Sequence, residues 1–131
     1  MDAREMLATA RRIHVIGFST MPGKDAHEVP RFLIERGYDV VPIHPTATEI
    51  CGRKAYPTLA DAPGPYDLVN VFRPAHETPA IAREAVRLAA RALWLQTGIV
   101  SAEARAIAQA GGVHYVENAC TRVVHRFVQK P

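Results

Sequence analysis

The segment from Gly17 to Lys24 has the composition of a loop that holds an anion. Gly17 permits a tight turn, after which backbone N–H groups and the hydroxyls of Ser19 and Thr20 can face a phosphate. A helix predicted to start near His27 would point the positive end of its dipole at the same place, and Lys24 adds a mobile charge. The alternative is an ordinary strand-to-helix turn, in which glycine and serine are common. We favour phosphate binding over that alternative.

Two further loops place a ring or a charge at the end of a predicted strand. His44-Pro45 joins a flat imidazole to a rigid proline, so it can pack against the face of a base or serve only as a stiff turn. Arg73, between Phe72 and Pro74, carries a permanently charged guanidinium whose shape fits a phosphate. The alternative for Arg73 is a salt bridge with Glu77, and the sequence does not decide between the two.

A fourth loop, Gln96-Thr97-Gly98, suits a ligand that carries amides. Gln96 and Thr97 can hydrogen-bond such groups, and Gly98 allows a chain to approach closely. Trp94 precedes this loop within a predicted strand and is expected in the core. Cys120 follows the last predicted strand beside the same region, where a structural thiol is favoured over a reactive one.

The motifs of several enzyme classes are missing from these loops. Ser19 and Pro22 stand where the dinucleotide fingerprint Gly-x-Gly-x-x-Gly needs glycine, and His44-Pro45 replaces the acidic residue that would hold a ribose hydroxyl. The chain has no Gly-x-Ser-x-Gly elbow and no Walker loop, and its six histidines lack metal-ligand spacing. We therefore assign no catalytic residue and no metal ligand.

The elements that must position these loops alternate between short apolar runs and amphipathic segments. Asp2, Thr78 and Ser101 are expected helix caps, and residues 46–66 are expected to be irregular with one helical turn at 59–62. The predicted strands are 13–16, 38–43, 67–72, 92–95 and 113–116, and the predicted helices are 2–12, 27–36, 78–90, 101–110 and 121–129. Such alternation indicates an α/β, Rossmann-like, doubly wound, mainly parallel five-stranded sheet with helices on both faces. Ligands of such sheets bind at the carboxyl ends of the strands.

Bulk composition limits the remaining possibilities. The 131 residues are 48% hydrophobic and 22% charged, with net charge +3, and contain two cysteines. We expect one globular domain over residues 1–131 in the cytoplasm, with two reduced thiols and no signal peptide. No basic run indicates nucleic acid and no apolar stretch indicates a membrane span, so we expect neither partner.

In their order and spacing these segments resemble the CoA-binding domain family, small proteins related to the amino-terminal domain of the succinyl-CoA synthetase α subunit. The resemblance covers about residues 12–125. It rests on five segments: Val15-Ile16-Gly17-Phe18-Ser19, residues 35–45 (ERGYDVVPIHP), residues 52–59 (GRKAYPTL), residues 67–73 (DLVNVFR) and residues 94–98 (WLQTG).

This resemblance implies coenzyme A as the ligand, lying across the carboxyl edge of the sheet. It implies contacts to the phosphate region from Gly17, Phe18, Ser19 and Thr20 with Lys24 nearby, a lining of Val71, Phe72, Arg73 and Pro74, and contacts to the pantetheine arm from Gln96, Thr97 and Gly98. His44, followed by Pro45, stands where the family usually has asparagine. In the larger synthetases the phosphorylated histidine belongs to a second domain, and we expect this chain to end where that domain would begin.

We therefore predict non-catalytic binding of coenzyme A or an acyl-CoA, with no protein partner assigned. Two enzymatic alternatives remain: an NAD(P)-dependent oxidoreductase, and the CoA-binding subunit of an acyl-CoA ligase that acts with a partner chain. A third alternative is a thiol-handling protein that forms a mixed disulfide between Cys120 and CoA.

Overall fold

The computed structural model describes residues 1–128 and contains one five-stranded sheet and one short hairpin. The helices are α1 (Ala3–Thr9), α2 (Asp25–Glu35), α3 (Thr78–Arg87), α4 (Ala102–Ala110) and α5 (Thr121–His125), and a 3₁₀ turn, η1 (Ala75–Glu77), precedes α3. The strands are β1 (Arg12–Ile16), β2 (Asp39–Ile43), β3 (Glu49–Ile50), β4 (Arg53–Lys54), β5 (Leu68–Val71), β6 (Ala92–Leu95) and β7 (His114–Val116).

The sheet has the strand order β2-β1-β5-β6-β7, and each neighbouring pair is parallel. The chain adds β2 on one side of β1 and then returns to add β5 on the other side, so the order reverses between β1 and β5. This is the doubly wound, Rossmann-like sheet that the sequence predicts. A reversal of strand order opens a crevice at the carboxyl ends of the two strands involved.

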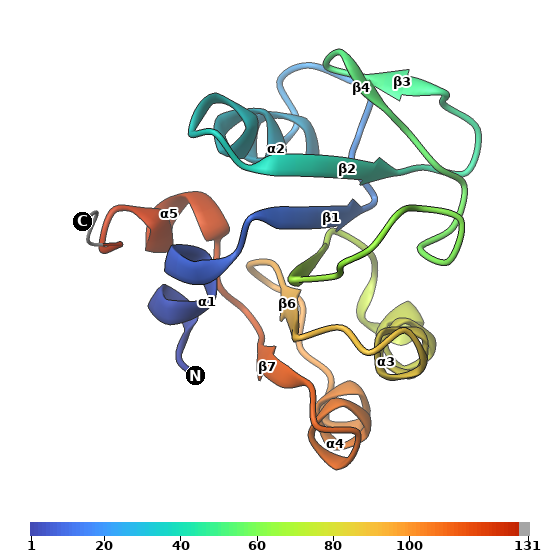
Figure 1. The fold of residues 1–131 in the computed structure, drawn as a ribbon, viewed down its shortest axis with the longest axis vertical. Helices are drawn as coiled ribbons and strands as arrows, with labels where there is room; N and C mark the ends of the chain where they lie inside the picture. The colour runs from blue at the N-terminus through green and yellow to red at the C-terminus, as the bar shows by residue number, and fades with distance from the viewer. Residues whose placement is uncertain (129–131) are drawn as a thin grey trace.

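Helices cover both faces of the sheet, as Figure 1 shows. On one face α1, α2 and α5 pack over Ile13, Val15, Leu68 and Trp94, and on the other face α3 and α4 pack over Val69, Val71, Leu93 and Leu95. The side chains of successive strand residues point to opposite faces, so strands buried on both sides appear in the sequence as continuous apolar runs. Trp94 is fully buried, as expected, and its Nε1–H donates to the Ala119 carbonyl oxygen at 2.8 Å.

Two of the three predicted caps are present. Asp2 accepts a hydrogen bond from the Glu5 N–H at 2.9 Å, and Ser101 accepts one from the Ala104 N–H at 3.0 Å. The prediction that Thr78 caps a helix is wrong, because η1 runs directly into α3 and places Thr78 inside the helical segment. The Thr78 hydroxyl donates to the Ala75 carbonyl oxygen at 2.7 Å.

Three other segments differ from the predicted elements. Helix α1 ends at Thr9 and not at Arg11 or Arg12, because the backbone N–H groups of both arginines donate to Asp67 and draw the chain into β1. The irregular segment 46–66 contains the β3–β4 hairpin, and residues 58–62 form hydrogen-bonded turns without a helix. Helix α5 ends at His125, so the predicted helix is too long: residues 126–128 are described and are not helical, and only its predicted last residue, 129, lies outside the described residues.

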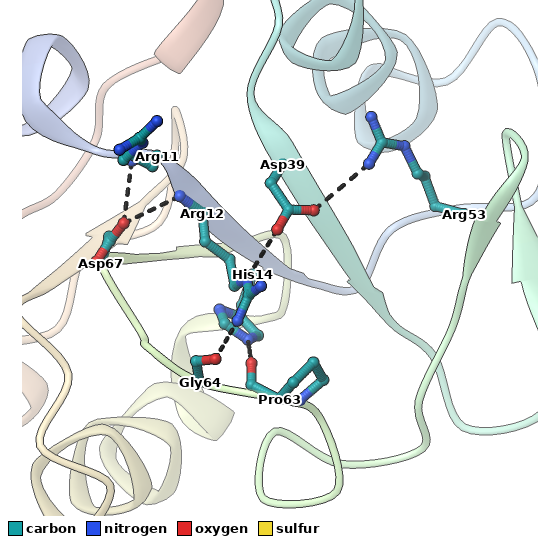
Figure 2. A network of polar contacts seen from close by, with 8 residues as sticks. All are labelled: Arg11, Arg12, His14, Asp39, Arg53, Pro63, Gly64 and Asp67. Atoms are coloured by element: carbon teal, nitrogen blue, oxygen red, sulfur yellow. Dashed lines mark hydrogen bonds and ion pairs between the residues drawn. The ribbon is translucent and has the colours of Figure 1, made fainter.

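A polar network closes the amino-terminal edge of the sheet (Figure 2). Asp39 bridges Arg12 at 2.8 Å and Arg53 at 3.4 Å, while Asp67 accepts two backbone N–H groups at 3.0 Å each. Burial raises the pKa of the Asp67 carboxyl, but these N–H groups and the neighbouring arginines outweigh burial and leave the pKa below its ordinary value. Ligands of open parallel sheets bind at the opposite edge, where the carboxyl ends of the strands lie.

Candidate functional site

The loops after β1 and β5 touch at the point where the strand order reverses. Gly17 has φ +86°, and a Cβ atom built there would lie 2.5 Å from the Phe72 carbonyl oxygen. The Phe72 N–H also donates to the Ile16 carbonyl oxygen at 2.9 Å. Only glycine fits this close approach, so Gly17 holds the two loops together beneath the crevice.

A first cavity of about 520 Å³ opens beside the ends of β1 and β2. It is lined by six residues that the sequence predicts, Gly17, Phe18, Ser19, His44, Pro45 and Arg73, and by five that it misses, Ile16, Ile43, Pro57, Glu77 and Ile81. The missed residues are mostly apolar side chains at strand ends or in the long connection after β2, and no local motif marks them.

A second cavity of about 630 Å³ lies on the other side of the loop after β5. Its lining includes the predicted residues Lys24, Phe72, Arg73, Pro74, Gln96 and Thr97, together with Asp25, Ala26, Val29, Ile99, Cys120, Arg122 and Val123. Arg73 lines both cavities, so the two spaces meet at its side chain. No local pattern marks Arg122 as a site residue, because its position depends on how α5 packs over the sheet.

Three predicted residues line neither cavity. Thr20 is exposed, and Gly98 is exposed with its N–H donating to Asn118 Oδ1 at 2.7 Å. Val71 is fully buried in the core beneath α3 and α4. Phe18 is also fully buried, with its ring edge-on to that of His27, so only its backbone is placed to face a ligand.

The loop after β1 is held by its own hydrogen bonds. The Ser19 N–H donates to the Ala26 carbonyl oxygen at 2.9 Å, and the Ser19 hydroxyl accepts from the Met21 N–H at 3.1 Å. The Ser19 N–H, expected to face an anion, is therefore used inside the loop. Lys24 is the residue before α2 and forms no ion pair with any described carboxylate, which leaves its charge available to a ligand.

Arg73 forms the salt bridge that the sequence offered as the alternative to phosphate binding. Its Nε–H and Nη2–H donate to the two carboxylate oxygens of Glu77 at 3.0 and 2.6 Å. The pair raises the pKa of Arg73 and lowers that of Glu77. Because a guanidinium has five N–H donors, the pairing fixes the plane of Arg73 and leaves donors on its Nη1 side for a second anion.

His44 is fixed by its own loop. Its Nδ1 accepts hydrogen bonds from the N–H groups of Thr46 at 3.1 Å and Ala47 at 2.9 Å. The ring is therefore a structural part of a stiff turn, and it also lies at the wall of the first cavity. The stiff-turn interpretation of His44-Pro45 is therefore confirmed, and packing of the ring against a base stays a prediction.

Gln96 connects the second cavity to α5. Its Oε1 accepts from the Thr121 N–H at 3.0 Å and from the Thr121 hydroxyl at 3.1 Å, and Asn70 donates to the same hydroxyl at 3.3 Å. All three side chains are buried. The Gln96 oxygen is therefore used to hold the start of α5, which brings Cys120 and Arg122 to the cavity wall.

Residues 1–128 contain neither a candidate metal site nor a candidate membrane-spanning helix. No group of three or more His, Cys, Asp and Glu side chains is arranged there to hold a metal ion. No helix within that range has the length and apolarity that crossing a membrane requires.

An open parallel sheet with paired cavities over its topological reversal defines a Rossmann-like ligand-binding fold. The model of the family described as CoA binding domain matches residues 11–126, and the chain belongs to that family. A Bacillus subtilis (strain 168) relative called Uncharacterized protein YneT is 34% identical over 124 residues, which are 95% of this chain and 92% of that protein.

Solved structures show the same fold. A hypothetical protein from Pyrococcus horikoshii OT3 superposes with a TM-score of 0.92 at 33% identity, covering 97% of this chain and 89% of that chain. The apo form of a dinucleotide-forming acetyl-coenzyme A synthetase 1 from Ca. Korarchaeum cryptofilum gives a TM-score of 0.74 at 25% identity. That match covers 85% of this chain but 26% of the synthetase chain.

Proposed function

We propose that this chain forms one domain that binds coenzyme A or an acyl-CoA along the carboxyl edge of its sheet and catalyses no reaction by itself. Family membership supports the ligand class. The observation that carries the proposal is the pair of cavities that meet at Arg73, because an elongated ligand with anionic groups near its middle fits such a crevice.

The chemistry of the two cavities supports an orientation for that ligand. The first cavity offers the His44 ring, Pro45 and Ile81 as surfaces for an adenine base. Gly17 and Arg73 lie at the junction, where a pyrophosphate would face the guanidinium. The second cavity is lined by apolar side chains, Val29 and Ile99 among them, that suit a pantetheine arm. Its wall also carries the positive charges of Lys24 and Arg122.

The test of this site compares Arg73, which precedes η1, with Arg87, which ends α3. Arg73 and Arg87 each donate from Nε and Nη2 to a glutamate at 3.0 and 2.6 Å, but Arg87 is the last residue of α3, away from both cavities. We expect Arg73→Ala to weaken CoA binding in calorimetry by about 10- to 100-fold, the value of one or two charge-assisted hydrogen bonds. Arg87→Ala should bind as the unmodified protein does. Equal affinities for all three proteins would refute the proposed site.

The ligase-subunit alternative has one specific observation in its favour, the similarity to part of a larger acetyl-coenzyme A synthetase. Under this alternative the chain supplies the CoA site to a separate catalytic partner. Affinity purification from the source cells should then recover a nucleotide-binding partner with acyl-CoA-forming activity. Recovery of the chain alone, with CoA affinity intact, supports the binding-module proposal instead.

Two further parts of the proposal concern the thiols. Cys120 is half-buried at the wall of the second cavity, beside the space that we assign to the pantetheine arm. Intact mass after incubation with CoA disulfide tests whether this thiol forms a mixed disulfide with CoA. Neither Cys51 nor Cys120 is in a disulfide, which suits a reducing compartment, and we propose the cytoplasm.

A further inference from the structure

A second cysteine lies outside both cavities, beside a buried histidine. Cys51 is exposed at the tip of the β3–β4 hairpin, and its Sγ lies 3.6 Å from Nε2 of His27, a residue of α2. The two residues are 24 positions apart in the sequence, so the hairpin must fold over the start of α2 to bring them together. A thiol in contact with an imidazole is the pairing that activates cysteine nucleophiles.

The orientation of His27 makes it a hydrogen-bond acceptor toward the thiol. Its Nδ1 lies 2.7 Å from the Ser19 carbonyl oxygen, which only accepts, so Nδ1 carries the proton. In the neutral ring Nε2 then has a free lone pair directed at Cys51. His27 is only 8% exposed and its ring packs edge-on against Phe18, so this tautomer and this direction are fixed by packing.

The backbone at Cys51 is unusual for a cysteine. Cys51 has φ +51° and Gly52 has φ +76°. Both residues of this two-residue hairpin loop therefore have a left-handed backbone conformation. Such loops favour asparagine, aspartate or glycine at the first position, because other side chains are strained in the left-handed conformation. Cysteine is therefore a strained choice, and strain at a nucleophile paired with a base motivates a functional hypothesis.

We propose that Cys51 is a site of thiol–disulfide exchange with a low-molecular-weight disulfide, and that His27 is its general base. In the forward step Nε2 of His27 takes the thiol proton as Sγ of Cys51 attacks one sulfur of the disulfide. The new bond joins Cys51 to that sulfur, the S–S bond of the reagent breaks, and the leaving thiolate takes the proton from His27. One disulfide is consumed and one is formed, so no other oxidant is needed.

The charges around Cys51 explain why a base matters here. Burial raises the pKa of the Cys51 thiol, Glu28 raises it further, and Arg31 lowers it, with a net pKa above the ordinary value. The glutamate and the arginine lie on α2 and are joined by a 2.7 Å ion pair, which moderates both effects. The thiolate is therefore scarce near neutral pH, and rapid exchange requires proton removal by His27 during the attack.

The experiment measures the rate at which each cysteine forms a mixed disulfide when the protein is incubated with glutathione disulfide. Peptide mapping and mass spectrometry identify the modified cysteine. Cys120 serves as the internal comparison in the same chain. We expect His27→Asn to slow exchange at Cys51 about 100-fold relative to Cys120, the usual range for loss of a general base. The matched control is His114→Asn, which alters an exposed histidine on β7 and should leave the ratio unchanged.

A measurement on the unmodified protein keeps the proposal open to refutation if His27→Asn does not fold. At neutral pH Cys51 should exchange faster than N-acetylcysteine, although the pKa of its own thiol is raised, because His27 removes the thiol proton during the attack. A Cys51 rate at or below that of N-acetylcysteine would overturn the proposal. So would a folded His27→Asn variant with an unchanged ratio of rates. Neither outcome bears on CoA binding, which is measured separately.

Discussion

Replacing Gly17 with alanine should destabilise the protein and loosen the candidate site together. Two effects act at this position. The φ of +86° is left-handed, and the new Cβ would lie 2.5 Å from the Phe72 carbonyl oxygen and 3.0 Å from Cδ of Arg73. The first atom belongs to backbone in the loop after β5, so relief of the clash requires one of the two loops to move.

Each of these two effects lowers the free energy of unfolding by its own amount. A left-handed alanine costs about 1–2 kcal/mol, and forcing an extra carbon into a packed contact costs about 1–3 kcal/mol. We therefore expect Gly17→Ala to lower the free energy of unfolding by about 2–5 kcal/mol. The displaced loops carry Gly17 and Arg73, so CoA affinity should fall in the same variant.

Gly37→Ala is the matched control. Gly37 has φ +94°, but nothing lies within 4 Å of a Cβ built there, and the residue follows α2 at the far end of that helix from the site. Urea unfolding should show a loss of about 1–2 kcal/mol for this variant, with CoA affinity unchanged. Equal losses of stability in the two variants would refute the argument that the loops after β1 and β5 are in obligatory contact.

Three further predictions concern polar groups that are buried or half-buried. Burial lowers the pKa of His14 below its ordinary 6.5, so the unfolded chain binds the proton first and the unfolding free energy should fall as pH drops below 6.5, by at most about 1.4 kcal/mol per pH unit. His14→Gln should flatten that slope in urea titrations. The pKa of Asp67 is lowered, so its carboxylate stabilises the fold above the ordinary pKa of 3.8, and this contribution should disappear as pH falls below that value. The Asp67→Ala variant should not show this loss of stability at low pH. Thr121→Val leaves Asn70 and Gln96 short of a buried partner and should cost about 1–3 kcal/mol, measured by the same titration.

Much of the fold could be predicted from the sequence because its strands and helices have strong local signals. The run at 92–95 is apolar on both faces, three of the four residues at 13–16 are β-branched, and Asp2 and Ser101 lie where helix caps belong. The errors arose where distant residues decide the backbone. Asp67 ends α1 early from 55 positions away, and the β3–β4 hairpin has strands of two residues, too short to show a periodic pattern.

The candidate site was predictable in outline, because carboxyl strand ends meet at one edge whatever the side-chain details. Its details were not predictable, because they depend on competing partners. Gln96 and Ser19 are polar residues in the expected loops, yet Thr121 and Ala26 occupy groups that a ligand was expected to bind. The pairing of His27 with Cys51 required the folded position of the hairpin, and neither residue belonged to a motif.

The most direct test of CoA binding at the carboxyl edge is a backbone ¹⁵N NMR titration of the unmodified protein with CoA, run beside an identical titration with NAD. CoA should shift the amide signals of residues 17–24, 72–74 and 96–98 at the carboxyl edge and leave those near Asp67 and Asp39 unchanged. NAD should bind more weakly. No shift with CoA, tighter binding of NAD, or shifts centred on the amino-terminal edge would contradict the proposed function.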